Sequence, residues 1–161
     1  MNEPATPEER RALADRVELW LSEQVDANPV VRDVENDPDS ATRWFVRLIG
    51  DSKQGYTVVL DLGQRTLSYQ THFMPLPAEN QAEVFEFLLR RNARMFGLAF
   101  VVAGDGPNDE GPAVYLRGRT SVRLLAVDLD GELDQIFGSI YRWVEESFQP
   151  AIRSAFASKF N

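Results

Sequence analysis

Three consecutive runs of alternating apolar and polar side chains, between residues 44 and 73, constrain the fold of this chain more than any other feature. Short turns at residues 51–55 and at Gly63-Gln64 separate the runs. Successive side chains of a β-strand point to opposite faces of the sheet. The apolar side of the runs consists of Trp44, Val46, Leu48, Tyr56, Val58, Leu60, Leu62, Leu67, Tyr69 and Phe73. The pattern predicts an antiparallel meander with one apolar face and one face partly exposed to water.

A helix is predicted ahead of the meander. Thr6 and Glu9 form a capping box of the T-x-x-E type, and Pro7 suits the first helical turn. The helix is expected to end near Asn28, because a residue that precedes a proline disfavours the helical conformation. Its apolar side consists of Leu13, Val17, Trp20 and Leu21.

Two more helices and three more strands complete the predicted elements. Val30 to Val34 is a candidate short strand, and a second helix covers about residues 78–94. The apolar run 98–102 is expected to be a strand buried on both faces, with 113–117 as its hairpin partner. A third, long helix is expected to be capped by Asp130 and to break or kink at Pro150. The apolar stripe of that helix consists of Leu133, Ile136, Phe137, Ile140, Tyr141 and Val144.

This succession, summarised as α-β-β-β-α-β-β-α, indicates an α+β fold. Consecutive strands joined by tight turns favour an antiparallel sheet over a βαβ array. We expect a sheet of about five strands with helices packed on it. The 161 residues fit a single domain on size grounds, with a candidate C-terminal helical extension at 150–161.

The composition argues against several chemistries. The chain has no cysteine, which excludes disulfides, thiolate catalysis and cysteine-based metal sites. Its net charge of −8 repels phosphate polyanions on average, so no nucleic-acid partner is expected. Residues 1–11 lack the apolar segment of a signal peptide, and no apolar run approaches the roughly 20 residues that span a bilayer. We therefore expect a cytoplasmic protein without a membrane partner.

No catalytic or metal-binding constellation is recognisable, and neither a cofactor nor a metal is expected. His72 is the only histidine, and it shares the polar side of a strand with Ser68 and Gln70, which indicates a solvated residue. The acidic loop Gly104–Gly111 has calcium-binding side chains, but Pro107 occupies a position where an EF-hand needs an oxygen ligand. Turn chemistry accounts for the whole loop.

Other charged clusters also have ordinary structural explanations. Three aspartates lie at a helix N-terminus, where the helix dipole favours negative charge. This structural role explains them better than a catalytic pair of carboxylates does. They are Asp128, Asp130 and Asp134. Two arginine clusters could bind an anion, although Glu83 and Glu86 are spaced to pair with Arg90 on a helix. The clusters are Arg90, Arg91 and Arg94, and Arg117, Arg119 and Arg123.

The second predicted helix is the most informative element. Its apolar residues spread over an arc of roughly 200°, whereas a helix with one packing partner needs only about 100°. They are Val84, Phe85, Phe87, Leu88 and Leu89. One side is expected to face the sheet, and the other either another helix of the chain or a second copy of the protein. A C-terminal stripe leaves the same two alternatives, core or interface, for Phe148, Ile152, Phe156 and Phe160.

Several segments resemble the YbjN family, which is described as bacterial sensory transduction regulators. The resemblance lies in residues 87–92, in residues 96–100 followed by a Gly/Asp turn, and in residues 114–117. Leu133-Asp134, Gly138, Ile140 and Val144 fit the last helix of the family. The resemblance implies a fold like that of type III secretion chaperones, and a small acidic homodimer that binds other proteins through apolar surfaces without a cofactor. The family pattern supplies no functional residues, and the chain departs from it beyond Pro150.

The leading functional hypothesis is a non-enzymatic, chaperone-like or regulatory protein-binding domain that forms a homodimer, with residues 84, 85, 87, 88 and 89 as its partner surface. The alternative is a small-molecule binding or hydrolytic domain, with a pocket between sheet and helices lined by aromatic side chains. These are Trp20, Trp44, Tyr56 and Tyr69. Nucleic-acid binding is a third hypothesis, which the charge disfavours.

Overall fold

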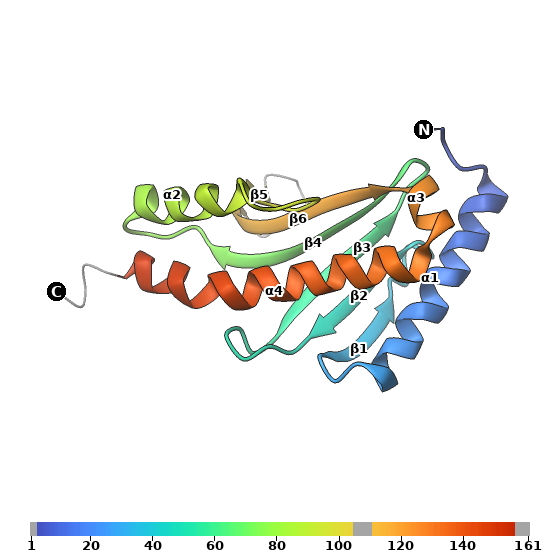
Figure 1. The fold of residues 1–161 in the computed structure, drawn as a ribbon, viewed down its shortest axis with the longest axis horizontal. Helices are drawn as coiled ribbons and strands as arrows, with labels where there is room; N and C mark the ends of the chain where they lie inside the picture. The colour runs from blue at the N-terminus through green and yellow to red at the C-terminus, as the bar shows by residue number, and fades with distance from the viewer. Residues whose placement is uncertain (1–2, 105–110, 157–161) are drawn as a thin grey trace.

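A computed structural model describes residues 3–104 and 111–156, which form two layers. A six-stranded antiparallel sheet is one layer, and helices packed on one of its faces are the other (Figure 1). The elements are α1 (Pro7–Ala27), β1 (Val31–Asn36), β2 (Arg43–Leu48), β3 (Tyr56–Leu62), β4 (Thr66–Pro75), α2 (Gln81–Asn92), β5 (Ala99–Ala103), β6 (Ala113–Ser121), α3 (Val122–Val127) and α4 (Leu129–Ala155).

The predicted count of about five strands is too low, because β1 is a full sixth strand. It pairs with β2 from Val31 to Asn36, although Val31 is its only fully buried residue. The structure also contains a short helix that was not predicted, α3. The side chain of its N-cap residue, Ser121, accepts a hydrogen bond from the Leu124 amide. Six residues are too few to show helical periodicity in a sequence, which explains why α3 was not expected.

The strand order is β1-β2-β3-β4-β6-β5, and every neighbouring pair is antiparallel. The meander of β2, β3 and β4 follows the predicted alternation, with its apolar side facing the helices. The strand β5 lies at the edge of the sheet, and 53% of the Val102 side chain is exposed. The expectation that residues 98–102 are buried on both faces is therefore wrong, because the helices pack on only one face of the sheet and Val102 lies at the sheet edge (Figure 1).

The first helix agrees with its sequence signals. The Thr6 hydroxyl accepts a hydrogen bond from the Glu9 amide at 3.1 Å, and the Glu9 carboxylate accepts one from the Thr6 amide at 3.2 Å. The capping box and the burial of its apolar side are both confirmed, the latter at Leu13, Val17, Trp20 and Leu21.

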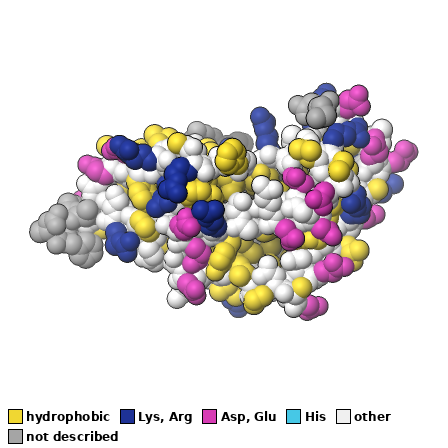
Figure 2. Space-filling view, in the orientation of Figure 1, with side chains coloured by type: hydrophobic (Ala, Val, Ile, Leu, Met, Phe, Trp, Pro, Cys, Tyr) yellow, Lys and Arg dark blue, Asp and Glu magenta, His cyan; other side chains and the backbone are white. Residues whose placement is uncertain are grey.

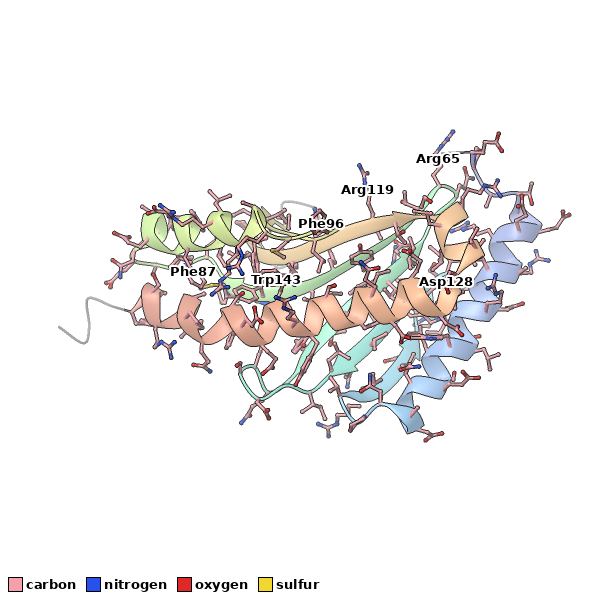
Figure 3. The ribbon with its side chains drawn as sticks, in the orientation of Figure 1. Arg65, Phe87, Phe96, Arg119, Asp128 and Trp143 are labelled. Carbon is pink, nitrogen blue, oxygen red and sulfur yellow. The ribbon has the colours of Figure 1, made fainter. Side chains whose placement is uncertain are left out.

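The last helix differs from its prediction at both ends. Asp128, not Asp130, is the N-cap residue, because its carboxylate accepts a hydrogen bond from the Gly131 amide at 3.1 Å (Figure 3). The helix also continues through Pro150 to Ala155. A proline removes one backbone hydrogen bond from a helix, and burial of Ala151 and Ala155 on the core holds the last turns in place. Residues 150–155 are thus part of α4 rather than a separate extension.

The core lies between α4, its neighbouring helices and the apolar face of the sheet. Trp20 of α1 stacks on Phe137 of α4 with ring centroids 5.7 Å apart, and Phe73 contacts both Phe100 and Phe148 at 4.8 and 5.7 Å. Of the C-terminal stripe, Phe148 and Ile152 pack against this core. Phe156 is 42% exposed, and Phe160 lies outside the described residues.

Candidate interaction surface

The five apolar residues predicted as a partner surface on α2 have three different environments. Val84 and Leu88 are buried, and Phe85 and Phe87 are partly buried against the core. Leu89 is 64% exposed. The helix packs on both α4 and β5, so two neighbours within the same chain account for most of its wide apolar arc.

The start and end of α2 differ from the predicted range 78–94. Asn80 has a left-handed backbone conformation with φ of 58°, and the helix begins at Gln81. The Asn80 amide donates to the carbonyl oxygens of Ser154 and Ala155 at 3.4 and 3.2 Å, which ties this corner to the last turn of α4. Phe87 lies between α2 and α4 with the Arg91 guanidinium 4.5 Å from its ring (Figure 3).

An apolar groove runs between α2 and the edge strand β5. Its volume is about 190 Å³. Leu89 and Val102 are its most exposed lining residues, and hydrophobic side chains reach the surface over α2 in Figure 2. The lining consists of Phe85, Leu88, Leu89, Phe100, Val101, Val102 and Val114.

One side chain takes the place of a missing strand beside β5. The Asn92 amide group accepts a hydrogen bond from the Phe100 N–H at 2.7 Å and donates one to the Phe100 carbonyl at 3.0 Å. In an antiparallel pair, alternate residues direct their backbone groups toward the neighbouring strand. Because Phe100 bonds outward to Asn92, the backbone N–H and C=O of Val102 also face outward, next to the groove.

The opposite face of the sheet is covered by none of the described helices. Side chains opposite one another there include Phe45, Val59, Gln70 and Arg117 in one row across the strands. The next row consists of Arg43, Asp61, Ser68 and Arg119. These residues line an open hollow of about 820 Å³. The alternation in the sequence predicted that this face is partly exposed to water, but it did not predict a hollow.

Lys53 is a partly buried cation that the sequence did not single out. Its ammonium donates to the carbonyl oxygens of His72 and Phe73 at 2.6 and 2.9 Å and lies 5.2 Å from the Phe148 ring. Burial lowers the pKa of Lys53 to about 8. The carbonyls that it binds sit at the bulge of β4, where the pairing with β6 shifts register between His72 and Met74.

The turn that carries Lys53 is fixed to α4. Ser52 donates from its amide to the Glu145 carboxylate and from its hydroxyl to the Glu145 carbonyl, both at 2.9 Å. Gln149 donates to the Ser52 carbonyl at 2.8 Å. A signal for this arrangement is absent from the sequence, because the partners are about 93 residues apart.

Several of the remaining candidate residues have structural partners. His72 is exposed and makes an edge contact with Tyr115 at 5.5 Å. Arg90 pairs with Glu86 at 2.9 Å, as the helical spacing predicted. Arg123 pairs with Glu9 at 2.9 Å. Asp130 and Asp134 are exposed on the first turns of α4.

The aromatic residues proposed to line a pocket are part of the core. Trp20, Trp44, Tyr56 and Tyr69 are each at most 7% exposed. Of these, Tyr69 alone lines the small hollow of about 180 Å³ beside α4, and its hydroxyl donates to the Gly97 carbonyl at 2.8 Å. Burial raises the pKa of Tyr69 to about 12.

Within residues 3–104 and 111–156, no group of three or more histidine, aspartate or glutamate side chains is arranged to hold a metal ion. The centre of the loop considered for calcium, residues 105–110, lies outside the described residues. The described helices include none with the length and apolar character needed to cross a bilayer.

The fold thus defines a two-layer α+β protein with a six-stranded antiparallel sheet. The chain is 31% identical over 121 residues to an uncharacterised protein of Mycobacterium leprae, which covers 75% of this chain and 61% of that protein. It is equally 31% identical over 114 residues to uncharacterised proteins of Mycobacterium tuberculosis and Mycobacterium bovis, covering 71% of this chain and 57% of theirs. The chain therefore spans about three fifths of the length of these relatives. No family model and no solved structure matches it.

Proposed function

We propose that this chain is a non-enzymatic, chaperone-like or regulatory protein-binding domain that forms a homodimer. The observation that carries the proposal is the apolar groove between α2 and β5, whose rim exposes Leu89 and Val102. The resemblance to YbjN proteins and to the type III secretion chaperone fold supports the same class. The proposal keeps the cytoplasmic location expected from the sequence.

A second copy of the chain is the occupant that suits this groove best. The two exposed apolar side chains, Leu89 and Val102, lie on its rim beside an edge strand whose Val102 backbone groups face outward. A two-fold dimer brings the same patch of both subunits together, so each subunit inserts its Leu89 into the groove of the other. A stable interface buries about 800 Å² per partner, which requires α2 and β5 to take part together.

Sedimentation equilibrium over a concentration series tests the dimer. The wild-type chain is expected to be dimeric at micromolar concentration, and the variant Leu89→Asp monomeric. Loss of one buried leucine costs about 1.5–3 kcal/mol per site, and burial of an unpaired carboxylate costs more. Each 1.4 kcal/mol is about a tenfold change in the dissociation constant.

The control is Leu19→Asp on the outer side of α1. Leu19 is 62% exposed, against 64% for Leu89, so the two variants make the same chemical change at equal exposure. Leu19→Asp is expected to remain dimeric. A wild-type chain that stays monomeric at high micromolar concentration contradicts the homodimer, and a dimeric Leu89→Asp variant contradicts this surface.

A further inference from the structure

The uncovered face of the sheet has a different chemistry from the groove. Phe45 and Val59 lie side by side at its centre and are partly exposed. Polar and cationic side chains surround them on β2, β3, β4 and β6. The charged groups on the two sides of this hollow are not paired to the same extent.

On the β2 side one cation is already paired with two carboxylates. The Arg43 guanidinium pairs with Asp61 at 3.1 Å and with Asp37 at 3.2 Å. These carboxylates raise the pKa of Arg43. This side of the hollow therefore carries one more negative than positive charge, so the carboxylates of a ligand are attracted only to the β6 side.

On the β6 side two guanidinium groups have no carboxylate partner among the described residues. Arg117 donates from Nε and Nη2 to the neutral Gln70 amide oxygen at 3.0 and 2.9 Å, which holds its guanidinium against the sheet. Arg119 makes no hydrogen bond or ion pair with the residues that the structure describes. It projects from β6 away from α4 (Figure 3). The chain carries 25 acidic against 17 basic side chains, so an unneutralised arginine pair is an unexpected feature of its surface.

We propose that this face binds an extended acidic segment of a partner protein, with acidic side chains on Arg117 and Arg119 and an apolar side chain on Phe45 and Val59. This inference rests on the protein-binding class proposed above, and it names the chemistry of the partner. Guanidinium groups form strong, often bidentate hydrogen bonds with carboxylates.

The spacing of the two arginines selects the conformation of the partner. Arg117 and Arg119 are two residues apart on one strand face, so their Cα atoms are about 6.6–6.8 Å apart. An extended chain with acidic residues at positions i and i+2 has the same repeat and presents both carboxylates on one side. Two adjacent acidic residues would point to opposite sides.

The shape of the hollow favours a peptide over a small molecule. Small-molecule sites typically bury about 70–90% of the ligand, whereas this hollow lies open along a sheet face. Nucleic acid is disfavoured, since its affinity needs many phosphate contacts and the protein is net acidic.

The test uses two fluorescein-labelled peptides of identical composition and charge. Thr-Val-Glu-Thr-Glu-Val-Thr has both glutamates on one side of an extended chain, and Thr-Val-Glu-Glu-Thr-Val-Thr has them on opposite sides. Fluorescence anisotropy measures their affinities for the full chain, and amide chemical shifts locate the contact and detect weak binding. The first peptide is expected to bind about tenfold more tightly than the second, with shifts on β2, β3, β4 and β6.

The variants Arg117→Glu and Arg119→Glu are expected to weaken binding of the first peptide by about tenfold or more, since each replaces an attraction with a repulsion. The matched control is Arg94→Glu, which makes the same charge change at an exposed residue beyond α2 and is expected to leave the affinity unchanged. Circular dichroism confirms that the variants fold.

Four results overturn the proposal. They are no binding of either peptide, equal binding of both peptides, equal loss of binding in the Arg94→Glu control, and shifts confined to α2 and β5. Displacement of the peptide by a thymidine oligonucleotide would instead assign the face to phosphate. A change of sedimentation mass in Arg119→Glu would assign it to self-association. The dimer is tested by sedimentation mass, and the acidic ligand by peptide binding. Failure of one proposal therefore leaves the other testable.

Discussion

At the scale of single residues, Lys53 makes the stability of the molecule depend on pH. Its ammonium is partly shielded from water and contacts two carbonyl oxygens and the Phe148 ring. Desolvation favours the neutral amine, and this effect lowers the pKa of Lys53 from 10.5 to about 8. The amine form still donates to the same carbonyls, so loss of the proton does not release the turn.

The pKa of Lys53 predicts a defined window of pH dependence. Between about pH 8 and 10.5 the unfolded chain binds a proton at Lys53 that the folded chain has lost, so this group makes the folded state more stable as pH rises. The raised pKa of Tyr69 acts in the opposite sense above pH 10. Comparison of wild type with Lys53→Met cancels the tyrosine contribution, because both chains contain it.

Urea denaturation at a series of pH values measures the free energy of unfolding of both chains and so tests this prediction. The difference between wild type and Lys53→Met is expected to grow in favour of the wild type from pH 8 to 10.5. The ¹³Cε resonance of Lys53 should titrate near pH 8. A midpoint near the ordinary lysine value would show that the carbonyls and the ring offset the whole effect of burial.

At the scale of elements, the edge strand β5 depends on one side chain from the helix before it. Asn92 satisfies the outward N–H and C=O of Phe100 as a neighbouring strand would. An unpaired backbone edge is a template for unwanted strand pairing, so Asn92 limits the open edge to the part beside Val102. The same contact fixes the end of α2 to β5 and thereby shapes the groove.

Replacement of Asn92 is expected to destabilise the fold by about 1–3 kcal/mol, the usual cost of leaving buried backbone groups unsatisfied. Asn92→Ala loses both hydrogen bonds. Asn92→Asp keeps an acceptor for the Phe100 N–H but sets a carboxylate against the Phe100 carbonyl. Because a protonated carboxyl has both a donor and an acceptor, the Asp variant should regain stability relative to Asn92→Ala as pH falls below about 4.

Chemical denaturation at neutral and acidic pH measures the two variants, with amide exchange at Phe100 as a local readout. Parallel behaviour of Asn92→Asp and Asn92→Ala at all pH values would mean that the carboxyl does not replace the amide. A wild-type-like Asn92→Ala would mean that the contact does not hold the edge.

The sequence predicted elements with strong local signals and missed those fixed by distant contacts. The capping box at Thr6 and the alternation of β2, β3 and β4 are local, and both are confirmed. The cap of α4 was placed at Asp130 because Asp128 and Asp130 are equally good cap residues, and only the backbone geometry chooses Asp128. The helix was expected to break or kink at Pro150, because the burial of Ala151 and Ala155 that holds its last turns on the core is a tertiary effect.

The candidate surface was predictable only in part. The apolar arc of α2 indicated extra packing, but its sequence could not divide the arc between α4, β5 and solvent, and only Leu89 proved strongly exposed. The role of Asn92 required knowing that β5 is an edge strand. The hollow over Phe45 required the register that places it beside Val59 and in one row with Gln70 and Arg117.

At the scale of the whole molecule, the two proposed surfaces use different residues. The groove belongs to α2 and β5, whereas Phe45, Val59, Arg117 and Arg119 lie on the sheet face that the helices leave uncovered. The residues that line the two surfaces do not overlap. Mutations at sites that share no partners usually have additive effects. Self-association at the groove, as proposed above, would therefore leave both uncovered sheet faces of a dimer available to partners.

This separation predicts that the two activities can be removed one at a time. Leu89→Asp should sediment as a monomer and bind the acidic peptide with the affinity of the wild type, because Leu89 does not line the hollow. Arg117→Glu should remain a dimer and lose the peptide. The wild-type dimer should bind two peptides, one on each subunit, without cooperativity. Sedimentation velocity with labelled peptide measures mass and stoichiometry in one experiment. A single peptide per dimer, or loss of peptide binding on conversion to monomer, would mean that the two surfaces form one site across the subunits.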